Sequence, residues 1–178
     1  MAALAQLTHS RHICLADSAD LEAIVAIYNQ NIEAKKATAD LRPVEVQARQ
    51  AWFDSHLTDP HRPIYVIKNA LGEMMAWGSF SNLYERPAYH ISSEISIYVS
   101  RDFQRQGLAR QLIDWMLAQA PKLGIHNVVA LVFAHNEASL ALFERLGFVR
   151  WGVMPQVCDM DGFTADVVML GRAILPSQ

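Results

Sequence analysis

The sequence predicts an α/β fold with a mixed central β-sheet flanked by helices, and three observations support this prediction. Segments that alternate polar and apolar residues, as strands do, occur between segments whose apolar residues recur at helical spacing. Of the 178 residues, 52% are hydrophobic and 19% are charged, which is enough apolar material to bury a core. The sequence contains no internal repeat or linker, so we expect one domain over residues 13–173 after a loose leader over residues 1–12.

The first half of the chain predicts a strand, two helices and a hairpin. In chain order these are a strand over residues 13–16, a helix over 21–32, a helix from about Pro43 to 58, and strands over 64–67 and 74–80. Asp17 to Asp20 supply N-cap side chains for the first helix, whose apolar residues follow helical spacing. Proline suits the first turn of the second helix, and the turn over residues 69–72 joins the two strands.

The second half predicts four more strands and two helices. In chain order these are a strand over residues 91–99, a helix over 107–120, a strand over 128–134, a helix over 137–146, and strands over 148–154 and 167–170. Strict alternation identifies the first of these strands and puts Glu94 in its middle. Gly124 and Gly147 lie where glycine ends a helix.

Charge and cysteine content exclude several classes of protein. Fifteen basic and eighteen acidic residues give a net charge of −3, which does not favour binding to nucleic acid. The sequence has no apolar run of roughly 18 residues, so we expect no membrane span and a cytoplasmic protein. Cys14 and Cys158 are far apart and fit buried thiols in a reducing compartment. His9 and His12 lack supporting ligands, so we predict no metal site.

The segment from Tyr98 to Arg110 predicts a strand, a glycine-containing turn and the start of a helix. Successive backbone N–H groups in such a turn, together with the positive end of a helix dipole, can hold a pyrophosphate. A turn of this kind also occurs without a ligand. The segment has no Walker lysine and lacks the three glycines of the dinucleotide fingerprint.

The same segment carries a resemblance to a known family. Gln104 to Ala109 match the Q/R-x-x-G-x-G/A motif of the GNAT acetyltransferase superfamily, and residues 136–139 and 143–148 resemble its N-x-x-S and L-G-F segments. Within that superfamily, residues 93–99, 28–33 and 86–89 resemble the phosphinothricin acetyltransferase group. The resemblance extends from about Ile13 to Leu170.

The resemblance implies a GNAT fold with a splayed strand pair and a direct transfer of acetyl from acetyl-CoA to an amine. It implies cofactor-binding roles for Ile97, Tyr98, Val99, Arg105, Gln106, Gly107, Leu108, Ala109, Arg110 and Asn136. It implies substrate-binding roles for Arg86, Pro87, Ala88, Glu94, Ile95 and Ser96, and a homodimer. The acceptor that it implies is the α-amine of a small analogue such as phosphinothricin, methionine sulfoximine or methionine sulfone.

Glu94 is the candidate general base, because the ammonium of the acceptor must lose a proton before its nitrogen can attack. Partial burial would raise the pKa of this carboxylate toward a useful range, whereas a lone strand carboxylate is more often simply solvated. Arg86 is a candidate clamp for the acceptor carboxylate, because its guanidinium offers a planar pair of donors. The alternative for Arg86 is a solvated surface charge.

Two departures from the family pattern bear on specificity. Phe143 stands where herbicide-detoxifying members have histidine, and Ala109 replaces the second glycine of the motif. The acid that protonates the leaving thiolate is unassigned: Tyr98 and His135 are near in sequence, but the sequence does not put either of them beside the sulfur. The alternative functions are acetylation of another amine (polyamine, aminoglycoside or protein N-terminus) and a non-catalytic acyl-CoA sensor.

Overall fold

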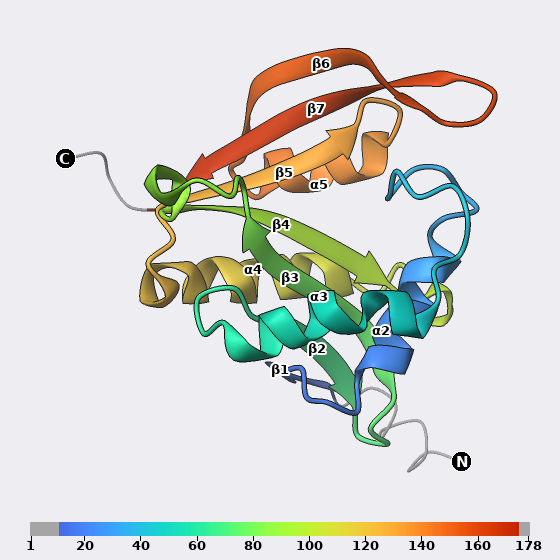
Figure 1. Ribbon diagram of the computed structural model, residues 1–178, viewed down its shortest axis with the longest axis vertical. Coiled ribbons are helices and arrows are strands. Elements are labelled where there is room, and N and C mark those ends of the chain that lie inside the picture. Colours follow the sequence, from blue (N-terminus) through green and yellow to red (C-terminus); the bar gives the residue numbers. More distant parts are fainter. Residues whose placement is uncertain (1–10, 175–178) are drawn as a thin grey trace.

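A seven-stranded mixed sheet forms the centre of the structure, with strand order β1-β2-β3-β4-β5-β7-β6 (Figure 1). The strands are β1 (Arg11–Leu15), β2 (Ile64–Asn69), β3 (Met74–Asn82), β4 (Ser92–Val99), β5 (Asn127–Phe133), β6 (Val149–Asp159) and β7 (Thr164–Ala173). Neighbouring strands are antiparallel except β4 and β5, which are parallel. The computed structural model describes residues 11–174.

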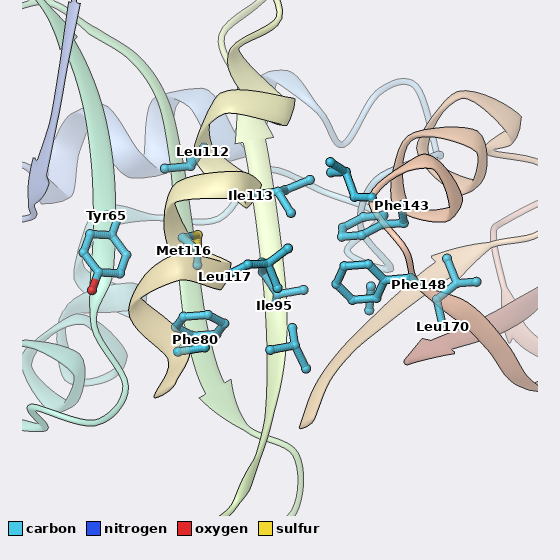
Figure 2. Packing of buried hydrophobic residues seen from close by; sticks show 14 of the residues in the cluster. Tyr65, Phe80, Ile95, Leu112, Ile113, Met116, Leu117, Phe143, Phe148 and Leu170 are labelled. Atoms are coloured by element: carbon cyan, nitrogen blue, oxygen red, sulfur yellow. The ribbon is translucent and has the colours of Figure 1, made fainter. Parts of the chain in front are cut away.

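Helices cover both faces of the sheet, as the sequence predicts. They are α2 (Leu21–Gln30), α3 (Val46–Thr58), α4 (Leu108–Gln119) and α5 (Glu137–Arg145). The apolar sides of α2 and α3 pack with β2 and β3 in one cluster, and those of α4 and α5 pack in a second cluster on the other face. Figure 2 shows the second cluster, in which Ile113 and Leu117 of α4 lie beside Ile95 of β4. Each helix therefore has a buried apolar side that fixes its position against the sheet.

β4 and β5 lie together at one end only. Their register pairs join Ser92 to Asn127, Ser93 to Val128 and Glu94 to Val129, and the strands then diverge toward the end of β4 (Figure 1). This confirms the predicted splayed pair, and it leaves the second half of β4 without a neighbour on that side.

The first strand begins earlier than predicted. Arg11 and His12, which we assigned to the leader, pair with Asn69 and Lys68 in the sheet. His9 lies outside the described residues, and so do the other residues of the leader up to residue 10.

The start of α2 corrects a second expectation. Asp20 is the N-cap residue, but its side chain makes no capping hydrogen bond. Its carboxylate instead accepts from the backbone N–H of Asp17 at 3.0 Å and pairs with Lys68 Nζ at 2.7 Å. The tertiary ion pair with β2 has taken the side chain that local capping would have used.

Three further details differ from the sequence expectations. α3 begins at Val46, three residues after Pro43, so the proline lies before the helix and not in its first turn. Cys14 and Cys158 are unpaired, but they are half-buried and not buried. Among residues 11–174, no helix is long and apolar enough to cross a bilayer.

Candidate active site

β4 presents different groups to its two neighbours. Ile91 O accepts from the backbone N–H groups of His126 and Asn127, on the β5 side, whereas Ser100 N donates to Met75 O, on the β3 side. Backbone groups alternate along a strand, so Ile97 and Val99 direct their N–H and C=O groups into the gap beside β5. Tyr98, which we expected to bind in the same way, directs its backbone groups toward β3. The gap therefore offers a free strand edge to an extended amide-containing chain.

The turn before α4 has the geometry of an anion site. Arg105 and Gly107 have positive φ values of 62° and 75°, and α4 begins at Leu108. The first backbone N–H groups of a helix have no partner within it, and here they follow directly from the turn. A guanidinium nitrogen of Arg11 donates a hydrogen bond to the backbone oxygen of Gln106 at 3.1 Å, which helps to fix the turn. Arg105 and Arg110 are exposed, so the predicted pyrophosphate cradle is open and positively charged.

A pocket lies on the face of β4 that α2 and α3 cover, between the sheet and these two helices. It encloses about 540 Å³ of empty space, part of which is open to solvent. The lining side chains are Ile24, Val25 and Tyr28 from α2, Arg49 and Trp52 from α3, and Trp77, Ser79, Ser81, Ser96 and Tyr98 from the sheet.

Aromatic rings form much of the pocket wall. Ring centroids are 4.7 Å apart for Trp77 and Tyr98, 5.0 Å for Tyr28 and Tyr98, and 5.9 Å for Trp52 and Trp77. Such contacts hold rings in fixed positions, so the wall is rigid and apolar. Trp77 is 3% exposed, and its indole N–H has no hydrogen-bond acceptor among the described residues.

Arg49 adds a positive charge to this wall. Its guanidinium carbon lies 4.7 Å from the ring centre of Tyr28 and 5.6 Å from that of Trp52. One terminal nitrogen donates to Asp40 Oδ2 at 3.1 Å, and the Tyr28 hydroxyl donates to the same oxygen at 2.5 Å. Two rings and one carboxylate thus fix the guanidinium at the pocket.

Glu94 belongs to the same face of β4 as the pocket residues Ser96 and Tyr98, because side chains alternate along a strand. Its Cα partner on β3 is Ser81, which also lines the pocket. Burial raises the pKa of Glu94. No described residue donates a hydrogen bond to its carboxylate or forms an ion pair with it. A partly desolvated, unpaired carboxylate beside a pocket has the properties of a general base.

Burial and the nearby Tyr28 raise the pKa of Tyr98, so its hydroxyl keeps its proton at neutral pH. Its ring faces the pocket, whereas His135, the other candidate for the thiolate acid, bonds through Nε2 to Lys35 O at 2.7 Å.

Not all predicted substrate residues come together. Ile95 is 3% exposed and packs on the α4 face of the sheet, so its side chain does not reach the pocket. Arg86, Pro87 and Ala88 lie on the exposed loop between β3 and β4, which includes the 3₁₀ turn η1 (Pro87–Tyr89). This loop leaves β3 next to the Ser81–Glu94 pair and not at the aromatic wall.

Asn136 is already engaged in the structure. Its side-chain oxygen accepts from Ser139 N–H at 3.2 Å, which caps α5, and its Nδ2 donates to Lys36 O at 2.9 Å. A contact with the thiol arm of a cofactor would therefore replace its bond to the segment that follows α2.

Arg49 and Trp52 line the pocket, although neither was predicted to belong to a functional site. These residues are three apart in a helix, so their common face could be predicted. That this face meets Trp77 and Tyr98 depends on how α3 packs against the sheet, which spacing does not reveal.

Comparison with known proteins decides the family. Residues 23–148, more than half of the chain, match the Acetyltransferase (GNAT) family. The chain belongs to this family. The match confirms the predicted fold and enzyme class, an acetyl-CoA-dependent N-acetyltransferase.

Two relatives by sequence and one solved structure are similar to most of the chain. YwnH of Bacillus subtilis, provisionally named a phosphinothricin acetyltransferase, is 42% identical over 90% of this chain and 97% of its own length. The L-methionine sulfoximine/L-methionine sulfone acetyltransferase of Pseudomonas aeruginosa is 34% identical over 90% of this chain and 92% of its own. The solved structure of the yncA acetyltransferase from Salmonella typhimurium with its cofactor acetyl-CoA has a TM-score of 0.88 at 28% identity, and covers 95% of this chain and 96% of that one.

The site fits acetyl-CoA as co-substrate of this GNAT enzyme. The unpaired edge of β4 suits the amides of a pantetheine arm, and the turn before α4 suits a pyrophosphate.

Proposed function

We propose that this acetyltransferase modifies the α-amine of small amino-acid analogues of the methionine sulfoximine, methionine sulfone or phosphinothricin type. One observation carries the proposal: a single strand, β4, has the unpaired carboxylate of Glu94 on its pocket face and the free backbone groups of Ile97 and Val99 at its edge. An amine in the pocket is thus separated from the free edge by the width of one strand. The names of the relatives support the same acceptor class.

In this reaction each group of residues has a separate role. Acetyl-CoA supplies the activated acetyl group. Glu94 accepts a proton from the acceptor ammonium, directly or through one water, so that the nitrogen can attack. The backbone N–H of Val99 donates to the carbonyl oxygen on which negative charge develops, and the N–C bond forms as the C–S bond of the thioester breaks and CoA leaves as its thiolate. Residues 105–110 hold the pyrophosphate, and Arg86, with Pro87 and Ala88 shaping its loop, clamps the acceptor carboxylate.

The pocket charge argues against polyamines and aminoglycosides as acceptors. The pocket lining includes Arg49 but neither aspartate nor glutamate, and the neighbouring Asp40 is paired with Arg49. A polycation would meet a fixed positive charge, and the single carboxylate of Glu94 beside the pocket can balance only one of its ammonium groups.

We also propose a homodimer in the cytoplasm. Support for the dimer comes from the edge strand β6, whose exposed side chains include Val149, Trp151, Val153 and Val157. A row of apolar side chains on an edge strand is a surface that a second copy can cover. The two unpaired cysteines fit a reducing compartment.

The test is acetyl-CoA-dependent thiol release with L-methionine sulfoximine, L-methionine sulfone, phosphinothricin, spermidine, an aminoglycoside and a peptide N-terminus. We expect saturable turnover of the amino-acid analogues, and a decrease in kcat/KM of about 10²- to 10⁴-fold in Glu94→Gln. Glu22→Gln is the matched control, because Glu22 is exposed on α2. Turnover of spermidine or of the peptide alone would replace the acceptor class, and binding of acetyl-CoA with no turnover at all would favour a sensor.

A further inference from the structure

Arg49 has unused hydrogen-bonding capacity at the acceptor pocket. A guanidinium carries five N–H donors. Among the described residues the only hydrogen bond from this side chain goes to Asp40. Its side chain is 30% exposed, so the remaining donors are accessible to a ligand. The stacking on Tyr28 and Trp52 holds the group in place before any ligand arrives.

The same wall contains a second donor without a partner. The indole Nε1–H of Trp77 is buried, and no described residue accepts from it. A buried donor without an acceptor is unusual in a folded protein. Because the Trp77 nitrogen is itself not exposed, the accessible donors of Arg49 are the ones that a ligand can reach, and they favour a ligand that brings oxygen atoms to the aromatic wall.

The pocket has a direction that separates the two ends of an acceptor. Ser81, whose partner on β4 is Glu94, lines the end of the pocket next to the loop that carries Arg86, and Trp77 and Tyr98 line the other end. Four residues of strand span roughly 13 Å between Glu94 and Tyr98. An amino acid whose carboxylate lies toward Arg86, and whose amine lies over β4 between Glu94 and Val99, extends its side chain along the aromatic rings toward Arg49.

We infer that Arg49 binds the side-chain oxygen of the acceptor, the sulfone, sulfoximine or phosphinate oxygen, and thereby selects oxidised side chains over plain thioethers. This inference rests on the proposed acceptor class. The methylenes of the acceptor lie against the rings, and its tetrahedral oxo group accepts hydrogen bonds from the guanidinium. Methionine fits the same space but leaves the donors of Arg49 without an acceptor.

Arg49→Met tests this inference when L-methionine sulfone is compared with L-methionine. We expect the ratio of the two kcat/KM values to fall about 10- to 100-fold, because the variant loses the hydrogen bonds to the sulfone and no longer leaves unsatisfied guanidinium donors beside methionine. Arg49→Lys should recover part of the ratio, because it keeps the charge but not the planar donors. Arg42→Met is the control, because Arg42 is exposed and does not line the pocket.

Equal losses for the sulfone and for methionine would overturn the inference, since Arg49 would then act on a part common to both acceptors or on the fold. An unchanged ratio would overturn it as well. If the wild-type protein acetylates neither amino acid but binds acetyl-CoA, the proposed function fails instead.

Discussion

The desolvation of Glu94 affects the chemistry and the stability in opposite directions. Burial raises the pKa of its carboxylate, which makes it a better proton acceptor once it is ionised. The folded state therefore holds the proton more tightly than the unfolded state does. The stabilising contribution of the neutral form is present at low pH and is lost as the pH rises through the folded-state pKa.

We accordingly expect two pH effects from Glu94→Gln. As the pH is lowered, the wild-type kcat/KM should begin to decline at a pH above 4.5, the ordinary pKa of glutamate. The residual activity of the variant should not show this decline. The variant should also unfold at a higher temperature than the wild type at neutral pH, with a difference that shrinks toward acid pH. Rate profiles and thermal unfolding across pH measure both effects. A lower Tm at neutral pH would contradict the sign.

Gly78 is required for a close approach of strands below the pocket. A Cβ on this residue would lie 2.6 Å from Ile97 Cδ1 and 2.9 Å from the backbone oxygen of Ser96. The backbone oxygen cannot move without disturbing β4.

We expect Gly78→Ala to lower the free energy of unfolding by about 1–3 kcal/mol, because it overpacks a region where the backbone is fixed. Denaturant unfolding measures the change. Gly152→Ala is the matched control, because a Cβ there would meet nothing within 4 Å. Equal effects of the two substitutions would show that close approach at Gly78 is not the cause.

At the scale of elements, one buried arginine fixes both ends of the loop that carries Arg86. Arg62 is 5% exposed, and it donates to Asn82 Oδ1 at 2.9 Å before the loop and to His90 O at 2.7 Å after it. Burial lowers its pKa, and none of these acceptors is charged. Arg62 is thus a positioning residue for the proposed clamp.

Arg62→Met should lower the free energy of unfolding by about 2–4 kcal/mol, because it removes the hydrogen bonds of a buried, charged donor to Asn82 and His90. It should also raise KM for the acceptor while leaving KM for acetyl-CoA unchanged. Arg62→Lys keeps the charge but has fewer donors, so its free energy of unfolding and its KM for the acceptor should lie between those of the wild type and Arg62→Met. Steady-state kinetics with each substrate varied in turn separate these results. A matching rise in both KM values would indicate a general loss of structure instead of a displaced loop.

The elements were predicted to different degrees, for physical reasons. Alternation over residues 91–99 identified β4 and the mid-strand place of Glu94, and helical spacing identified α4. The same alternation puts Ile95 opposite Glu94. We assigned Ile95 to the pocket from the family resemblance and not from this geometry. The aromatic wall joins α2, α3 and β3, so it depends on packing between distant segments.

At the scale of the whole molecule, β6 is the edge strand of the sheet that exposes a row of large apolar side chains, and β1 is the other edge strand. Val153→Glu should convert the proposed dimer to a monomer, because it buries a charge in an apolar interface. Sedimentation velocity measures this change. Leu71→Glu is the control, since Leu71 is equally exposed, at 59% against 53%, but lies in the turn between β2 and β3. A wild-type protein that is monomeric at micromolar concentration would refute the dimer.

The two sides of the gap between β4 and β5 are also separate in the sequence. Every side chain that lines the pocket comes from residues 24–98, whereas β5, β6 and β7 follow residue 126. The proposed choice of acceptor is thus encoded by one contiguous stretch, and the turn before α4 is encoded by the next. Exchange of that first stretch between related enzymes could change the amine that is modified while the donor of the acetyl group stays the same. Such modularity would let specificity evolve without rebuilding the other half of the sheet.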